Sequence, residues 1–142
     1  MAELKKVLFL CTGNSCRSQM AEAWVNKLRA NEWMAFSAGI ETHGMNPSAI
    51  SVMAESGVDM SQHYSKTVDK FQNKTFDLVV TVCDHAAEHC PTSLPSAVVK
   101  HIPFDDPPAL AKLAVNAEES LNSYRQVRDQ IKTFIESSTF SS

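Results

Sequence analysis

Residues 7–24 have the sequence VLFLCTGNSCRSQMAEAW, and this stretch decides the fold. Its first four residues are apolar, which predicts a buried strand, and the residues from Gln19 onward predict the first turns of a helix. A loop of small residues joins the two. A strand that passes into a helix through such a loop directs several backbone N–H groups at one point, where the helix dipole adds positive charge. The stretch therefore predicts a binding site for an oxyanion.

A cysteine and an arginine stand at the two ends of this loop. Cys11 begins it, and because the N–H groups and the dipole favour a thiolate, we expect a nucleophile there. Arg17 follows in the spacing Cys-x5-Arg-Ser and can offer two N–H groups to two oxygens of a tetrahedral anion. A buried, inert cysteine is the ordinary alternative. The strand–loop–helix setting, with Gly13 and Asn14 available for unusual backbone angles, favours catalysis.

Length and composition predict one domain spanning residues 1–142. Of these residues 44% are hydrophobic and 20% are charged, as in ordinary soluble globular proteins. The net charge of −3 gives no general attraction for nucleic acid, and no run of residues is long or apolar enough to cross a bilayer. We therefore expect a cytoplasmic protein whose thiols are kept reduced.

Strand-like and helix-like segments alternate along the chain. This alternation predicts an α/β fold, a central parallel sheet of about four strands with helices on both faces. Since the carboxyl ends of parallel strands share one edge, Cys11, Cys83 and the segment after Phe104 can converge there. The expected strands are residues 4–10, 34–38, 76–83 and 98–104, and the expected helices are residues 18–30, 49–55 and 118–137. The apolar positions expected on the first helix are Met20, Ala23, Trp24 and Leu28, and those on the last are Leu121, Tyr124, Val127, Ile131, Phe134 and Ile135.

Two further cysteines, Cys83 and Cys90, flank a short polar stretch after the third expected strand. With His85 and His89 they are possible metal ligands, but their spacing does not match that of zinc sites, and we expect no metal. Inert core thiols are a second possibility. The third, which the sequence favours, is a dithiol pair beside the nucleophile, since thiol–disulfide exchange needs only access and a suitable leaving thiol.

An aspartate follows the last expected strand, in the sequence Phe104-Asp105-Asp106-Pro107. It is a candidate general acid that protonates a departing oxygen. A turn-forming aspartate and a helix cap are commoner roles in Asp-Pro sequences. The local sequence alone leaves all three roles open.

Residues 11–22, together with Asp106-Pro107, resemble the low-molecular-weight tyrosine phosphatase superfamily, and most closely its thioredoxin-coupled arsenate reductase branch. The phosphatases usually have proline where Gln19 stands and an aromatic residue where Pro108 stands, and they lack the two cysteines 83 and 90. These differences favour the reductase. The matching stretches, which cover essentially the whole chain, are residues 9–22, 37–44, 77–83, 104–107 and 125–129.

The resemblance implies a role for each end of the loop. Cys11 is implied to be the nucleophile, with Ser18 hydrogen-bonding its thiolate. Arg17 is implied to bind arsenate, and Asp106 to act as the acid. The residues implied to contact the oxyanion, arsenate or a phosphate-like anion, are Thr12, Gly13, Asn14, Ser15, Cys16, Arg17 and Ser18.

The resemblance also implies a redox relay through Cys83 and Cys90, which thioredoxin reduces after each turnover. Cys16 has no part in that relay. No bound cofactor is implied, and the family is usually monomeric. In some members of this branch a potassium ion is held by an acidic residue and by residues that match Asn14, Glu22 and Ser37. Lys66 stands at the acidic position here, so we expect its ammonium to take the place of the cation and pair with Glu22, with weak or absent activation by potassium. The implied function is arsenate reduction in arsenic detoxification.

Two other functions remain open on the sequence. A phosphatase acting on phosphotyrosine or a small phosphoester would use Cys11, Arg17 and Asp106 without the second pair of cysteines. A thiol-based redox or metal sensor would bind an anion without turnover. Replacing Cys11 by serine would abolish either enzyme, whereas a sensor built on the other two cysteines would still oxidise.

Overall fold

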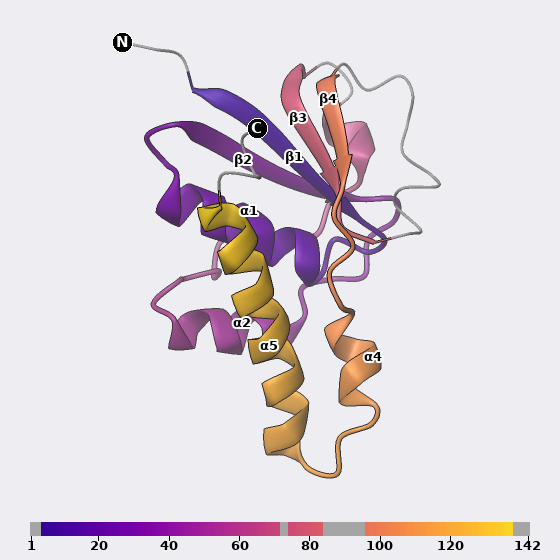
Figure 1. Ribbon diagram of the computed structural model, residues 1–142. Coiled ribbons are helices and arrows are strands. Elements are labelled where there is room, and N and C mark those ends of the chain that lie inside the picture. Colours follow the sequence, from indigo (N-terminus) through magenta and orange to yellow (C-terminus); the bar gives the residue numbers. More distant parts are fainter. Residues whose placement is uncertain (1–3, 72–73, 84–95, 138–142) are drawn as a thin grey trace.

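The computed structural model describes residues 4–71, 74–83 and 96–137, and it consists of one parallel sheet flanked by helices (Figure 1). The strands lie in the order β2-β1-β3-β4, with β1 at the centre paired to β2 and β3. The predicted α/β fold with four parallel strands is confirmed. The strands are β1 (Lys5–Cys11), β2 (Trp33–Gly39), β3 (Phe76–Thr81) and β4 (Ser96–His101).

Capping signals in the sequence set the helix boundaries. Asn46 caps α2 (Pro47–Glu55) through its side chain, and Gly57, with φ at 78°, follows the end of that helix. Asn116 caps α5 (Ala117–Glu136) in the same way. The remaining helices are α1 (Arg17–Leu28), the 3-10 helix η1 (Val68–Phe71) and α4 (Pro107–Ala111). No helix in the described part of the chain is long and apolar enough to span a membrane.

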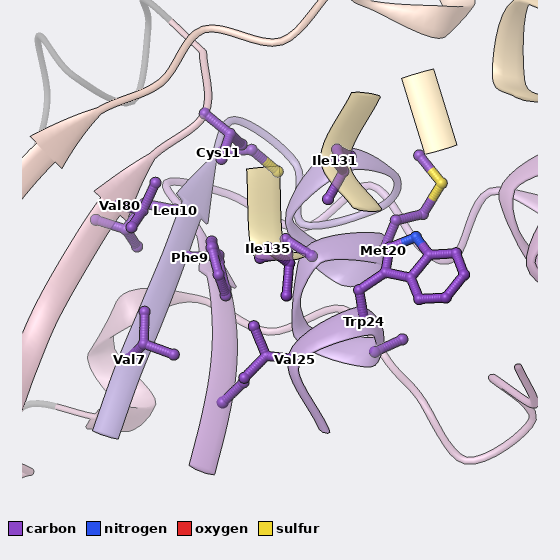
Figure 2. Packing of buried hydrophobic residues seen from close by; sticks show 14 of the residues in the cluster. Val7, Phe9, Leu10, Cys11, Met20, Trp24, Val25, Val80, Ile131 and Ile135 are labelled. Atoms are coloured by element: carbon purple, nitrogen blue, oxygen red, sulfur yellow. The ribbon is translucent and has the colours of Figure 1, made fainter. Parts of the chain in front are cut away.

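One part of the core lies between the sheet and the pair α1 and α5, and buried residues of α2 and η1 extend it. Figure 2 shows Phe9 of β1 close to Val25 of α1 and Ile135 of α5, with Cys11 at the far end of the same strand. The buried residues of α5 are Tyr124, Val127, Ile131 and Ile135, whereas Leu121 and Phe134 are partly buried. The prediction for Leu28 is wrong: it is the last residue of α1 and is 38% exposed.

Two strands end earlier than predicted. β3 stops at Thr81, although the next N–H, that of Val82, still donates to Leu10 of β1 at 2.9 Å. β4 covers Ser96–His101 rather than residues 98–104, because Pro103 has no N–H to continue the ladder. The two prolines after Asp106 begin α4, a helix that was not among those expected from the sequence.

Candidate active site

Residues 11–17, from the end of β1 to the start of α1, form the candidate oxyanion site, which we call the cradle. The carbonyls of this segment are turned away from the place of the anion. Four of these carbonyls accept backbone hydrogen bonds from the segment that follows β2. Because the C=O and N–H of one peptide unit point in opposite directions, the N–H groups of the loop face the other way, as an oxyanion site requires. The bonds run from Ile40 to Cys11, Glu41 to Thr12, His43 to Gly13 and Asn46 to Ser15, at 3.0–3.2 Å.

Two glycines permit this close packing. A Cβ on Gly13 would collide with the imidazole of His43, and one on Gly39 would collide with the backbone of Glu41 and of Thr12. Any side chain at either position would push the loop away from the segment that holds it.

The sulfur of Cys11 sits at the base of the cradle. Cys11 is 5% exposed, and its Sγ lies 2.8 Å from Ser18 Oγ. The backbone N–H of Asn14 donates to the same sulfur at 3.2 Å. Both contacts stabilise a thiolate, since each can present a proton to it.

Arg17 joins the loop to the ends of two other strands. Its Nη1 donates to the carbonyl of Phe104 at 2.9 Å and to that of Val82 at 3.3 Å. Its Nη2 lies 3.8 Å from Oδ1 of Asp106. The structure therefore brings together Cys11, Arg17 and Asp106 from three distant parts of the sequence.

Asp106 occupies the N-cap position of α4, but its side chain makes no capping hydrogen bond. Asp106 therefore stands where a capping residue would, but its side chain does not cap the helix, and the capping interpretation is wrong. The carboxylate is half exposed, with 49% of its side-chain surface accessible, and it faces Arg17. The neighbouring Asp105 accepts a hydrogen bond from Gln130 of α5 at 3.0 Å, which fixes this segment against the helix.

Cys83 lies on the rim of the cradle. Its Sγ is 3.4 Å from the hydroxyl oxygen of Thr12, the residue after the candidate nucleophile, and Cys83 is 6% exposed. Cys90, His85 and His89 lie outside the described residues. Within the described ranges, no group of three or more His, Cys, Asp or Glu side chains is arranged to hold a metal ion.

Cys16, the other cysteine of the loop, is held as a thiol. Its pKa is raised from 9.0 to about 12, mainly by burial and to a smaller extent by negative charge on Cys11, while Arg17 opposes the shift. A protonated, buried thiol is a poor nucleophile, so Cys16 serves as part of the loop's packing at neutral pH.

Ser65 and Lys66 support the loop from behind, and the sequence predicted no role for Ser65. Ser65 donates to the carbonyl of Asn14 at 2.7 Å, and the backbone N–H of Lys66 donates to Asn14 Oδ1 at 2.9 Å. The predicted pair of Lys66 and Glu22 is present, with Nζ and Oε1 3.7 Å apart. No local spacing could have identified Ser65, because its partner lies on a different element of the fold.

A family model described as low molecular weight phosphotyrosine protein phosphatase matches residues 6–138. The chain belongs to this family. Within it, the chain is 47% identical over 133 residues to an arsenate reductase 2 of Staphylococcus haemolyticus, covering 94% of this chain and 95% of that one. It is 48% identical over 136 residues to an arsenate reductase of Halalkalibacterium halodurans, covering 93% and 96%.

Solved structures of the same family agree with the fold. An arsenate reductase in the phosphate-binding state superposes with a TM-score of 0.79 at 32% identity, over 94% of this chain and 95% of that one. A low molecular weight protein tyrosine phosphatase from T. tengcongensis gives a TM-score of 0.73 at 26% identity, over 93% and 95%. One fold therefore carries both reductases and phosphatases, and the residues around the cradle must distinguish them.

Proposed function

We propose that this chain reduces arsenate to arsenite, with Cys11 as the nucleophile and thioredoxin as the final reductant. The observation that carries the proposal is the second sulfur beside the cradle, that of Cys83, 3.4 Å from the Thr12 hydroxyl. Phosphoester hydrolysis needs one thiolate, whereas reduction needs a second thiol that can reach the first. The names of the similar family members, arsenate reductases at 47–48% identity, support the same function.

The first step is a substitution at arsenic. The Cys11 thiolate attacks arsenic(V), a sulfur–arsenic bond forms, and one arsenic–oxygen bond breaks. Asp106 supplies a proton to the departing oxygen, which leaves as water. Arg17 and the N–H groups of the loop bind the remaining oxygens, where negative charge accumulates.

The second half transfers two electrons. The Cys83 thiolate attacks the Cys11 sulfur, a disulfide forms, and the electron pair of the sulfur–arsenic bond passes to arsenic, which leaves as arsenite. Cys90 then attacks Cys83, which releases Cys11 as a thiolate and leaves a Cys83–Cys90 disulfide. Thioredoxin reduces this disulfide by thiol–disulfide exchange and is itself oxidised. No bound cofactor is needed, and the protein works as a monomer in the cytoplasm.

Phosphatase activity is the alternative, because the same first step on a phosphoester would give a phosphocysteine that water can hydrolyse. The cradle suits phosphate as well as arsenate, since both are tetrahedral oxyanions. Phosphorus(V) bound to sulfur is not reduced, however, so a phosphatase has no use for Cys83 and Cys90.

The test follows NADPH oxidation by thioredoxin reductase and thioredoxin after arsenate is added. The wild-type protein should sustain oxidation, whereas Cys90→Ser should stop after about one turnover, because the Cys11–Cys83 disulfide cannot be resolved. Cys11→Ser should show no arsenate-dependent oxidation.

The controls separate the competing functions. Hydrolysis of p-nitrophenyl phosphate at a higher rate than arsenate-dependent oxidation in the wild type would contradict the reductase proposal. With a peroxide added as the oxidant in place of arsenate, formation of a Cys83–Cys90 disulfide in Cys11→Ser would indicate a sensor. The same reaction with glutaredoxin and glutathione in place of thioredoxin tests the identity of the thiol donor.

A further inference from the structure

Asn14 provides most of the support for the Cys11 sulfur. Its φ of 50° makes it the one non-glycine residue with positive φ in the described ranges. Its backbone N–H donates to Cys11 Sγ, and its side-chain Nδ2 donates to Ser18 Oγ at 2.9 Å, the hydroxyl that contacts the same sulfur. A left-handed conformation costs free energy, so the surroundings must hold Asn14 in place.

Donors surround the side-chain oxygen of Asn14. Gln19 Nε2 lies 2.8 Å from Oδ1, and Lys66 approaches it twice, with its backbone N at 2.9 Å and its Nζ at 3.4 Å. Gln19 is fully buried, and its Nε2 also lies 2.9 Å from the carbonyl of Tyr64. Because only donors face Oδ1, the Asn14 amide has one possible orientation, with its NH2 toward Ser18.

This orientation fixes the direction of a chain of hydrogen bonds. Lys66 donates to Asn14 and Asn14 donates to Ser18, so the Ser18 hydroxyl proton is available for the sulfur of Cys11. Every donor along this chain points toward Cys11. Hydrogen bonds aligned in one direction polarise each other, and an ammonium at the far end strengthens the effect.

The ammonium of Lys66 is itself held in place. Its Nζ lies 3.4 Å from Ser37 Oγ, 3.2 Å from the carbonyl of Tyr64 and 3.7 Å from Glu22 Oε1. Burial lowers the pKa of Lys66, while the charges of Glu22 and of Cys11 raise it. Glu22 in turn accepts from Ser37 at 2.8 Å and lies 3.5 Å from His63 Nδ1.

We propose that Lys66 is a positioning residue for the nucleophile: its ammonium, acting through the Asn14 amide and the Ser18 hydroxyl, holds Cys11 as a thiolate. The proposal rests on the proposed function only in taking Cys11 as the nucleophile. None of the described hydrogen bonds joins Lys66 to the sulfur. Its charge also interacts with that of Cys11 directly, and we assign the larger part of its effect to the chain of hydrogen bonds. Other ionisable groups near the loop include Cys16, Arg17, Cys83, Asp106 and Tyr124 of α5.

The experiment measures the rate at which iodoacetamide alkylates Cys11 as a function of pH, with the site identified by peptide mass spectrometry. Lys66→Met should move the midpoint of this profile up by about one pH unit, which slows alkylation about tenfold below the midpoint. Lys70→Met is the matched control, because Lys66 and Lys70 both lie over the Tyr64 ring, at 5.1 Å and 4.2 Å, and Lys70 is not one of the described donors to Asn14. This control should leave the midpoint unchanged.

A double-mutant cycle distinguishes transmission through the hydrogen bonds from a direct electrostatic effect of Lys66. Ser18→Ala removes the hydroxyl that joins Asn14 to the sulfur, so Lys66→Met in that background should shift the midpoint by less than about 0.3 unit. An equal shift in both backgrounds would overturn the proposal, since it would indicate a direct field or a general loosening of the loop. No shift in the wild-type background would overturn it as well. Lys66→Gln, which keeps a donor without the charge, replaces the methionine variant if that variant does not fold.

Alkylation requires no arsenate and no thioredoxin. A failure of arsenate reduction therefore leaves this test intact, and a failure of this test leaves the reductase function intact. Melting curves of all variants accompany the alkylation profiles.

Discussion

The two sides of the Cys11 sulfur are built differently. On one side Asn14, Ser18 and Gln19 are fully buried, with Asn14 bonded through its N–H, its carbonyl and its side chain. On the other side Asp106 is half exposed, and its closest charged contact is the 3.8 Å pair with Arg17. The nucleophile is thus fixed by the protein, whereas the acid is left near solvent.

This difference matches what each group must do. A thiolate is useful only if its donors are in place before the oxyanion arrives, because reorganising them during the reaction would raise the barrier. An acid must reach the departing oxygen of the substrate and exchange its proton with water between turnovers. The buried side therefore sets reactivity and stability together, and the exposed side sets turnover alone.

Arg17→Lys should have the largest effect on catalysis, since Arg17 is the residue that spans both sides. A lysine keeps the charge but loses the planar pair of donors and the bond to the Phe104 carbonyl. We expect kcat/KM for arsenate to fall about 10²–10³-fold, with weaker phosphate binding by calorimetry. An unchanged phosphate affinity would show that the arginine does not bind the anion.

Asp106→Asn should reduce kcat for arsenate by about 10²-fold, because the departing oxygen then leaves unprotonated. The free energy of unfolding should change by less than about 0.5 kcal/mol, as the carboxylate makes no capping bond. Urea titration measures the second quantity. A loss of stability with unchanged kcat would reverse the roles given to the two sides.

Asn14→Ala should lower the free energy of unfolding by about 2–4 kcal/mol, since it leaves the backbone N–H of Lys66 without its acceptor, removes the side-chain bonds to Gln19 and Ser18, and puts alanine at positive φ. Asn14→Gly also lacks the side chain, but it relieves the backbone strain because glycine adopts positive φ freely. Equal destabilisation in the two variants would assign the effect to the hydrogen bonds, and recovery in Asn14→Gly would assign it to the backbone.

Glu55 provides a comparison far from both sides. Arg125 and Arg128 of α5 bind the carboxylate of Glu55, in α2, at 2.7 Å and 3.1 Å. These contacts, the hydrogen bond from Arg125 most of all, lower the pKa of Glu55 from 4.5 to about 2. Because the folded pKa is depressed, this contribution to stability is complete above pH 4.5 and is lost as the pH falls toward 2.

Glu55→Gln should therefore lower Tm slightly at pH 7, and the difference from wild type should vanish as the pH falls from 4.5 to 2. Arsenate turnover should not change. Glu118→Gln, which removes the other carboxylate at Arg125, is the control. A difference in Tm that grows toward low pH would contradict the assigned cause.

The cradle could be predicted from the sequence because its parts are neighbours along the chain. The strand, the small-residue loop and the helix occupy residues 5–28, and their backbone geometry follows from local preferences. The central role of Asn14 could not be predicted, since Ser65 and Lys66 lie about fifty residues further along and carry no spacing signal.

The Asp106 segment was harder to predict for a different reason. An Asp-Pro pair is typical of turns, caps and acids alike, and only the position of Arg17 distinguishes them. Two prolines in succession begin α4 with a fixed φ, a signal that is visible in the sequence. The end of β3 could not be predicted from the local sequence, because it depends on pairing with β1. The strand ends at Thr81, although the N–H of Val82 still donates to β1.

A single turnover without thioredoxin tests the proposed reduction most directly. Fully reduced protein is mixed with arsenate, arsenite is quantified, and the disulfides are mapped by mass spectrometry. The mechanism predicts about one arsenite per chain, together with a Cys83–Cys90 disulfide and a free Cys11 thiol. All four cysteines remaining reduced, with no arsenite formed, would contradict it.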